Sequence, residues 1–137
     1  MRVFFDSSAF AKRYLCEDGS ELVLSWCDQA TELCLSGIAL PEIISAFCRL
    51  QRENLITQLQ YCQLKTMLMT DIIDAAICDL TPEVIRGTVI ALENNVLRGM
   101  DAIHVGSALV LKADVFVSAD ARQCLAAQRA GLQVVRV

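Results

Sequence analysis

Two kinds of hydrophobic pattern alternate along the chain. One is a short run of successive apolar residues, as in Val3–Phe5, which is typical of a strand covered on both faces in a parallel sheet. The other places an apolar residue at every third or fourth position, as at Leu40, Ile43 and Phe47, and predicts an amphipathic helix. The strand pattern falls on residues 3–5, 32–37, 76–80, 114–120 and 132–137, and the helical pattern on 7–14, 20–28, 40–54, 57–74, 81–94, 98–108 and 120–129.

Strands and helices therefore alternate, without the tight turns that join antiparallel strands into hairpins. This order predicts parallel strands with right-handed crossovers, and hence an α/β fold, a three-layer α/β/α sandwich with a mostly parallel central sheet. The chain has 137 residues, 55% of them hydrophobic, which is enough for one substantial core. We expect a single domain over residues 1–137, because no repeat or linker interrupts the pattern.

The composition indicates in which cellular compartment the protein is expected. The mean hydropathy is positive, but no run reaches the roughly 18 uncharged apolar residues that a bilayer-spanning helix needs. An acid, Asp6, comes before any apolar segment that a signal peptide would require. The seven cysteines form no CxxC pair and their number is odd, which favours mostly buried thiols in a reducing compartment. We expect a cytoplasmic protein without a membrane segment.

Four carboxylates occupy positions that such a fold would bring together. Asp6 and Asp120 follow apolar strands, whereas Glu42 and Asp101 lie in the first turns of helices. In open α/β sheets these places share one edge, where ligands bind. Close carboxylates repel one another unless a cation neutralises them, and Mg²⁺ or Mn²⁺ prefers oxygen ligands. We therefore predict one divalent-metal site formed by the four acids.

Two of the residues in these segments also have simpler interpretations. An acid in the first turn of a helix is stabilised by the helix dipole, so Glu42 alone would be assigned a structural role. His104 lies one turn after Asp101, and a single histidine is more often a core or supporting residue than a metal ligand.

The net charge of −4 does not decide the nature of the ligand. The four acids account for all of it, since 16 acids less four leaves 12 to balance the 12 Lys and Arg residues. The Lys and Arg residues form no continuous stripe that would contact nucleobases. The net charge neither excludes nor favours a polyanionic substrate.

The same residues resemble those of the PIN-domain ribonucleases, in particular the VapC-type toxins of bacterial and archaeal toxin–antitoxin pairs. The resemblance covers the whole chain. Its motifs are Phe5-Asp6-Ser7-Ser8-Ala9, then Glu42, then Asp101-Ala102-Ile103-His104, and finally Val117-Ser118-x-Asp120.

The resemblance implies a metal-dependent endoribonuclease. Asp6, Glu42, Asp101 and Asp120 would hold Mg²⁺ or Mn²⁺, which activates water to attack an RNA phosphodiester. Ser118 would orient the site by hydrogen bonding. The resemblance further implies a homodimer and a small antitoxin protein that silences it.

Other classes fit the motifs less well. A phosphatase of the haloacid dehalogenase type needs a second acid two residues after the first aspartate, where this chain has Ser8. A response-regulator receiver needs an acidic doublet and a lysine after a late strand, and Asp120 is not followed by one there. The remaining alternative is a catalytically silent PIN-like module that binds RNA or protein, and the presence of all four acids argues against it.

Overall fold

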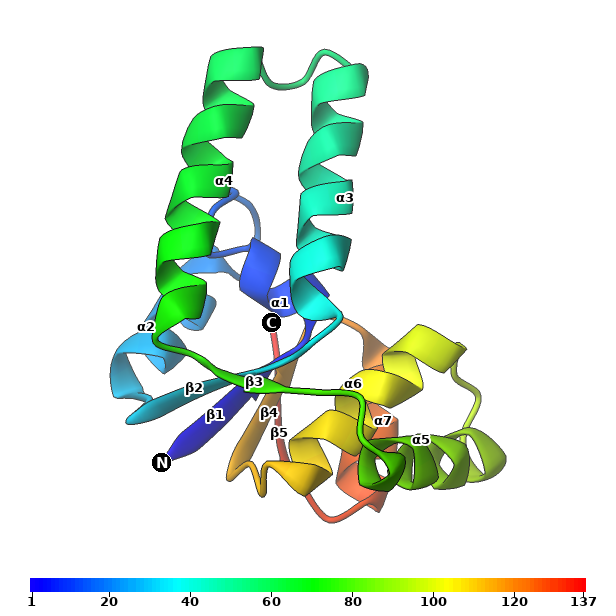
Figure 1. Cartoon of the computed structure of the whole chain (residues 1–137). Coiled ribbons are helices and arrows are strands. Elements are labelled where there is room, and N and C mark those ends of the chain that lie inside the picture. Colours follow the sequence, from blue (N-terminus) through cyan, green and yellow to red (C-terminus); the bar gives the residue numbers. More distant parts are fainter.

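The computed structural model of residues 1–137 contains one five-stranded sheet in which every neighbouring pair of strands is parallel (Figure 1). The strand order is β3-β2-β1-β4-β5. All five predicted strands are confirmed, although β3 ends at Cys78 because the chain turns between Asp79 and Thr81. The strands are β1 (Arg2–Phe5), β2 (Glu32–Ser36), β3 (Ala76–Cys78), β4 (Val115–Ser118) and β5 (Gln133–Arg136).

The seven predicted helices are also present. Helix α5 begins as expected, with Thr81 as its N-cap and Pro82 as its first residue. The first helix is shorter than predicted, because after Ala11 the backbone N–H groups of residues 12 and 13 bond to carbonyls three residues back. The helices are α1 (Ser7–Ala11), α2 (Ser20–Gln29), α3 (Ala39–Arg52), α4 (Gln58–Ile73), α5 (Pro82–Asn94), α6 (Gly99–Val110) and α7 (Ala121–Arg129).

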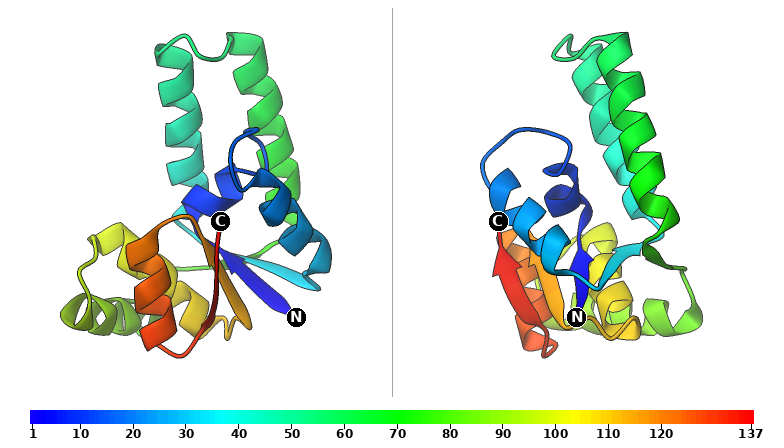
Figure 2. Two further views of the ribbon diagram at one scale, coloured as in Figure 1. Left: turned by 180° about the vertical axis from the view of Figure 1, so that it is seen from behind. Right: turned by 90° about the vertical axis from the view of Figure 1, so that its left-hand side faces the viewer.

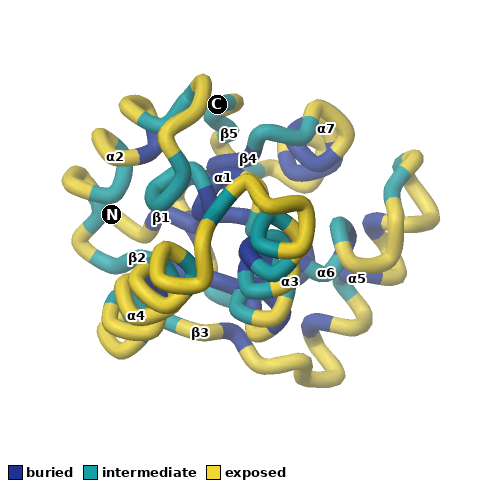
Figure 3. The backbone as a smooth tube through the Cα atoms, turned by 90° about the horizontal axis from the view of Figure 1, so that it is seen from above, coloured by how far each residue is buried: buried dark blue, intermediate teal, exposed yellow.

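Successive residues of β1 enter two different hydrophobic cores. Val3 and Phe5 face a core shared with α1, α2, α3 and α4, whereas Phe4 faces a second core shared with α5, α6 and α7. All three are fully buried, and Figures 2 and 3 show helices covering both faces of the buried strands. The three-layer α/β/α sandwich is therefore confirmed, and the unbroken apolar run in β1 is explained by its two covered faces.

The strand order reverses beside β1. From β1 the chain proceeds to β2 and β3 on one side, and later to β4 and β5 on the other. Just beyond β1, the backbone N–H of Asp6 donates to the carbonyl of Val117 in β4 at 3.1 Å. The crevice at a reversal of this kind is where ligands bind in open α/β sheets, so Asp6 lies at the expected edge.

Helices α3 and α4 form an antiparallel hairpin, which projects beyond the carboxyl ends of the strands (Figures 1 and 2). None of the helices is both long and apolar enough to cross a bilayer. All seven cysteines are free thiols, but only Cys34, Cys78 and Cys124 are buried, so the expectation that most of them are buried is wrong.

Helices α5 and α6 pack closely through a glycine. A Cβ atom at Gly106 would lie 2.8 Å from both the Val84 carbonyl oxygen and the Thr88 hydroxyl of α5. Both atoms are held in place, because the Thr88 hydroxyl donates to that same carbonyl at 2.8 Å. This contact sets the position of α6, the helix that carries Asp101 and His104.

We predict that Gly106→Ala lowers the free energy of unfolding by about 1–3 kcal/mol, because the added methyl group separates α5 from α6. Gly99→Ala is the matched control, since a Cβ there meets nothing within 4 Å. Urea denaturation of both variants measures the difference. Equal stability of the two variants would show that the close helix contact is unimportant.

Candidate active site

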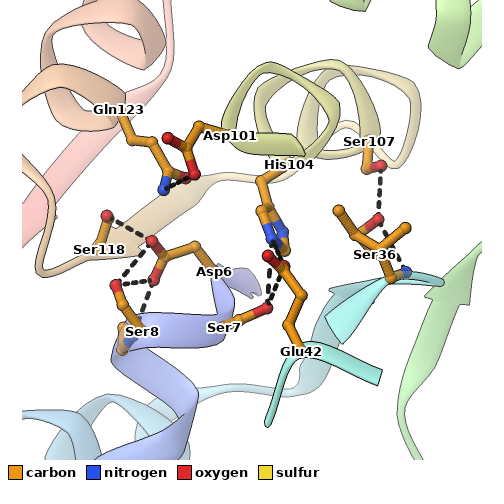
Figure 4. Close-up of polar contacts among 12 residues, drawn as sticks. Asp6, Ser7, Ser8, Ser36, Glu42, Asp101, His104, Ser107, Ser118 and Gln123 are labelled. Carbon is orange, nitrogen blue, oxygen red and sulfur yellow. Dashed lines mark hydrogen bonds and ion pairs between the residues drawn. The ribbon is translucent and has the colours of Figure 1, made fainter. Parts of the chain in front are cut away.

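Asp6 is the most buried acid of the molecule. It follows β1, is the N-cap residue of α1, and is fully buried. Its Oδ1 accepts hydrogen bonds from the Ala9 backbone N–H at 2.8 Å and from the Ser8 hydroxyl at 2.9 Å. Its Oδ2 accepts from the Ser118 hydroxyl at 2.7 Å (Figure 4). Three donors from β4 and α1 therefore fix the orientation of this carboxylate.

The surroundings of Asp6 compensate only part of the cost of burying its charge. Burial raises the pKa of Asp6 above its ordinary value, and the hydrogen bonds from Ser118 and Ala9 offset only part of that rise. No Lys or Arg side chain forms an ion pair with it. A buried carboxylate supported by neutral donors alone is a natural partner for a cation.

Glu42 projects from the first turn of α3 toward α1 and α6. Its Oε1 accepts a hydrogen bond from the Ser7 hydroxyl at 2.7 Å and lies 2.6 Å from His104 Nε2 (Figure 4). Burial alone would raise the pKa of Glu42, but these two hydrogen bonds outweigh it and lower the pKa. We assign the proton of His104 to Nε2 because an ionised carboxylate can only accept. Both contacts fall on one oxygen, and Oε2 has no hydrogen-bond partner.

Asp101 and Asp120 lie near each other at the starts of α6 and α7. Burial and then the charge of Asp120 raise the pKa of Asp101, with smaller contributions from Glu42 and Asp6. Asp120 caps α7, where its Oδ1 accepts from the backbone N–H groups of residues 122 and 123. The fold thus brings all four acids close enough for each of the other three to act on Asp101.

A pocket of about 280 Å³ lies at this edge of the sheet. Asp6, Glu42 and Asp101 line it, whereas Asp120 lies beside it and is not part of the lining. Arg49 is the only Lys or Arg residue in the lining. A larger hollow of about 650 Å³ runs along α4, but no carboxylate lines it. The pocket below the α3–α4 hairpin is therefore the candidate active site.

The chemistry of the donor set fits a hard divalent cation. Every acid offers carboxylate oxygen, and hydroxyl groups of Ser7 and Ser8 lie among them. Burial and, after it, the charge of Asp120 raise the pKa of Asp101, and a cation would relieve both effects. As the side chains are arranged, no three Asp, Glu, His or Cys groups are gathered tightly enough to chelate one ion. The residues thus suit a metal in their type and common location, but their side chains would have to move closer together to chelate it.

Sequence reasoning missed Gln123 as a side chain of the pocket, and it did not pair Ser7 with Glu42. Gln123 donates from Nε2 to Asp101 Oδ1 at 3.2 Å, and the Ser7 hydroxyl donates to Glu42 Oε1 at 2.7 Å. A polar residue at a core-facing position of a helix was the available signal for Gln123, since its neighbours Cys124 and Ala127 are buried with it. No local pattern could have paired Ser7 with Glu42, because the two are 35 positions apart.

The PIN domain family pattern matches residues 3–128. A search of curated proteins found no match. Among solved structures, FitAcB from Neisseria gonorrhoeae has a TM-score of 0.72 at 14% identity, covering 98% of this chain and 96% of that chain. VapC20 from Mycobacterium tuberculosis, a sarcin–ricin loop cleaving toxin, has a TM-score of 0.69 at 14% identity, covering 98% and 99%. VapBC2 from Rickettsia felis, bound to a DNA fragment from its promoter, has a TM-score of 0.69 at 12% identity, covering 100% and 99%. At these identities the likeness shows a shared fold.

We predict that Ser118→Ala lowers the free energy of unfolding by about 1–3 kcal/mol at neutral pH, because buried Asp6 loses a donor. The pKa of Asp6 is higher in the folded than in the unfolded chain. As the pH rises from the pKa of Asp6 in the unfolded chain to its pKa in the folded chain, ionisation of Asp6 therefore lowers the free energy of unfolding progressively. Since the Ser118 hydroxyl offsets part of that penalty, the effect of its removal should shrink in acid, where Asp6 is protonated.

Urea denaturation between pH 3 and pH 8 measures this dependence. Ser45→Ala serves as the control, since Ser45 is exposed on α3 and its hydroxyl makes no hydrogen bond. A loss of stability that stayed constant with pH would mean that Ser118 acts through packing and not through the charge of Asp6.

Proposed function

The chain belongs to the PIN domain family, and from this membership we propose that it is a metal-dependent endoribonuclease formed by a single PIN-like domain over residues 1–137. One observation carries the proposal. Asp6, Glu42 and Asp101 come from three separate elements and line one pocket at the reversal of strand order, with Asp120 beside them. An accumulation of negative charge with no Lys or Arg ion pair is costly for a purely structural site.

The four carboxylates would hold Mg²⁺ or Mn²⁺. The ion would supply a polarised water and stabilise the charge that develops on the phosphate. The chain's own contribution is to fix the donors. Ser8 and Ser118 orient Asp6, while Ser7 and His104 hold one oxygen of Glu42 and leave the other free.

The pocket also has a group suited to a phosphodiester chain. Arg49 follows Glu42 by seven positions on α3, so the two share a face of the helix, and both line the pocket. Arg49 is exposed and forms no ion pair. A guanidinium next to the acids offers a contact for a phosphate beside the one that is cleaved.

We further propose that the nuclease is the toxin of a toxin–antitoxin pair, acting as a homodimer and silenced by a small antitoxin protein. The support is the fold shared with VapC20, a toxin that cleaves the sarcin–ricin loop, and with a toxin–antitoxin complex from Klebsiella pneumoniae, which has a TM-score of 0.68 at 13% identity. RNA is proposed as the substrate from the resemblance to the PIN-domain ribonucleases.

The second candidate function is a catalytically silent PIN-like module that binds RNA or protein. It is favoured by the arrangement of the side chains, in which no three acids are gathered closely enough to chelate one ion. The two candidates differ in a single property, which is turnover that depends on both the metal and the acids.

We predict that the purified protein cleaves RNA with Mg²⁺ or Mn²⁺, and that Asp101→Asn reduces the cleavage rate at least about a hundredfold, because a ligand of the metal is lost. The variant should remain folded, since Asp101 is partly exposed and its neutralisation removes a half-buried charge and the repulsion by Asp120. Cleavage of a labelled RNA, followed with and without EDTA, measures the rate. Expression of the protein, but not of Asp101→Asn, should also arrest growth of the host cell.

Asp28→Asn provides the matched control, because Asp28 is exposed on α2 and does not line the pocket. It should retain wild-type cleavage. Full metal-dependent activity in Asp101→Asn would remove that residue from the site, and RNA binding without any cleavage by the wild type would establish the silent module. Growth arrest that a co-expressed neighbouring gene relieves would identify the antitoxin.

For Arg49→Gln we expect the KM for RNA to rise about fivefold with kcat within twofold of wild type, because one phosphate contact of about 1 kcal/mol is lost. The slope of log KM against log salt should become shallower by about 0.7, the value for one phosphate contact to a single strand. Arg52→Gln is the control, since Arg52 is exposed on the same helix but does not line the pocket. A fall in kcat alone would contradict a binding role for Arg49.

A further inference from the structure

Gln123 is in contact with two of the four acids. Its backbone N–H donates to Asp120 Oδ1 at 2.9 Å, and its side-chain Nε2 donates to Asp101 Oδ1 at 3.2 Å. Figure 4 shows its side chain reaching from α7 to Asp101 at the start of α6. One residue thus connects two carboxylates that repel each other.

The hydrogen bond from Gln123 is the only one that the Asp101 carboxylate accepts. Asp6 has three donors and Glu42 has two, so Asp101 is the least restrained acid of the pocket. If Gln123 were apolar, nothing would hold the Asp101 side chain in place against the charge of Asp120.

Gln123 is poorly suited to its position on grounds of stability alone. It is only 4% exposed, and its Oε1 is buried without any hydrogen-bond partner. An unpaired buried oxygen destabilises the folded state, whereas an apolar side chain of the same length would avoid that penalty. An amide in this place is therefore expected to serve the pocket it lines.

The neutral amide has a second advantage over a basic residue. Lys or Arg would also donate to Asp101, but its charge would cancel part of the negative potential that attracts a cation. Gln123 orients the carboxylate and leaves the charge of the pocket unchanged.

We propose that Gln123 is a positioning residue that holds Asp101 and Asp120 in register for a divalent cation. The proposal rests on the metal-dependent function proposed above. It assigns to Gln123 a role in metal affinity. A measurement of folding stability alone would not reveal that role.

The experiment compares Mn²⁺ binding, measured by isothermal titration calorimetry without RNA, with the melting temperature of the metal-free protein. Gln123→Met keeps the length of the side chain and removes the donor. We expect its Mn²⁺ affinity to fall about 10- to 100-fold, the range found for residues that orient metal ligands. Its melting temperature should equal or exceed that of the wild type, because the unpaired oxygen is gone.

A second variant separates the hydrogen bond from the polarity of the amide. Gln123→Asn keeps the amide but is too short to reach Asp101, so its Mn²⁺ affinity should fall as in Gln123→Met. Gln128→Met is the control, since Gln128 is exposed on the same helix and its side chain makes no hydrogen bond. It should bind Mn²⁺ as the wild type does.

The outcomes distinguish this proposal from the one on which it rests. If the wild type binds no Mn²⁺, the metal-dependent function fails, and the role of Gln123 fails with it. If the wild type binds Mn²⁺ and both Gln123 variants bind it equally well, only the role of Gln123 is overturned. A loss of affinity in Gln128→Met as large as that in Gln123→Met would also overturn it.

Discussion

Burial of negative charge at the reversal of strand order is the constraint on which the rest of the structure depends. Asp6 is fully buried between β1 and β4, and burial raises its pKa. A carboxylate in this position is tolerated only if its oxygens are hydrogen-bonded. The hydroxyl groups that follow β1 and end β4 meet this requirement, so the polar ends of both central strands follow from the presence of Asp6.

The donors around the acids are neutral almost throughout. Serine hydroxyls, a backbone N–H and the amide of Gln123 support Asp6 and Asp101, and no Lys or Arg forms an ion pair with any of the four acids. Paired bases would have stabilised the fold at the expense of the negative potential. The structure instead keeps that potential. This choice of donors is the one expected of a binding site, whereas a network of structural ion pairs would include the bases.

The apolar framework gives the acids their relative positions. The strand β1 sends alternate side chains into two cores, so it is fixed from both faces, and Asp6 is fixed with it. The helix α6 is placed against α5 by the close contact at Gly106, and it carries both Asp101 and His104. The backbone positions from which the acids project are therefore fixed by packing, which would lower the entropy lost when a ligand binds.

The sequence by itself determined the alternation of strands and helices, the parallel sheet, the two-sided burial of β1 and the edge at which the acids lie. These features follow from periodicity and from residues next to one another in the chain, such as the apolar run that ends at Asp6. Only the tertiary structure decided which groups touch. The contact of Glu42 with Ser7 and His104, and that of Gln123 with Asp101, join residues separated by 22 to 62 positions. Which of these residues come into contact depends on how the helices pack across the sheet. That packing depends on distances between side chains that no local pattern encodes.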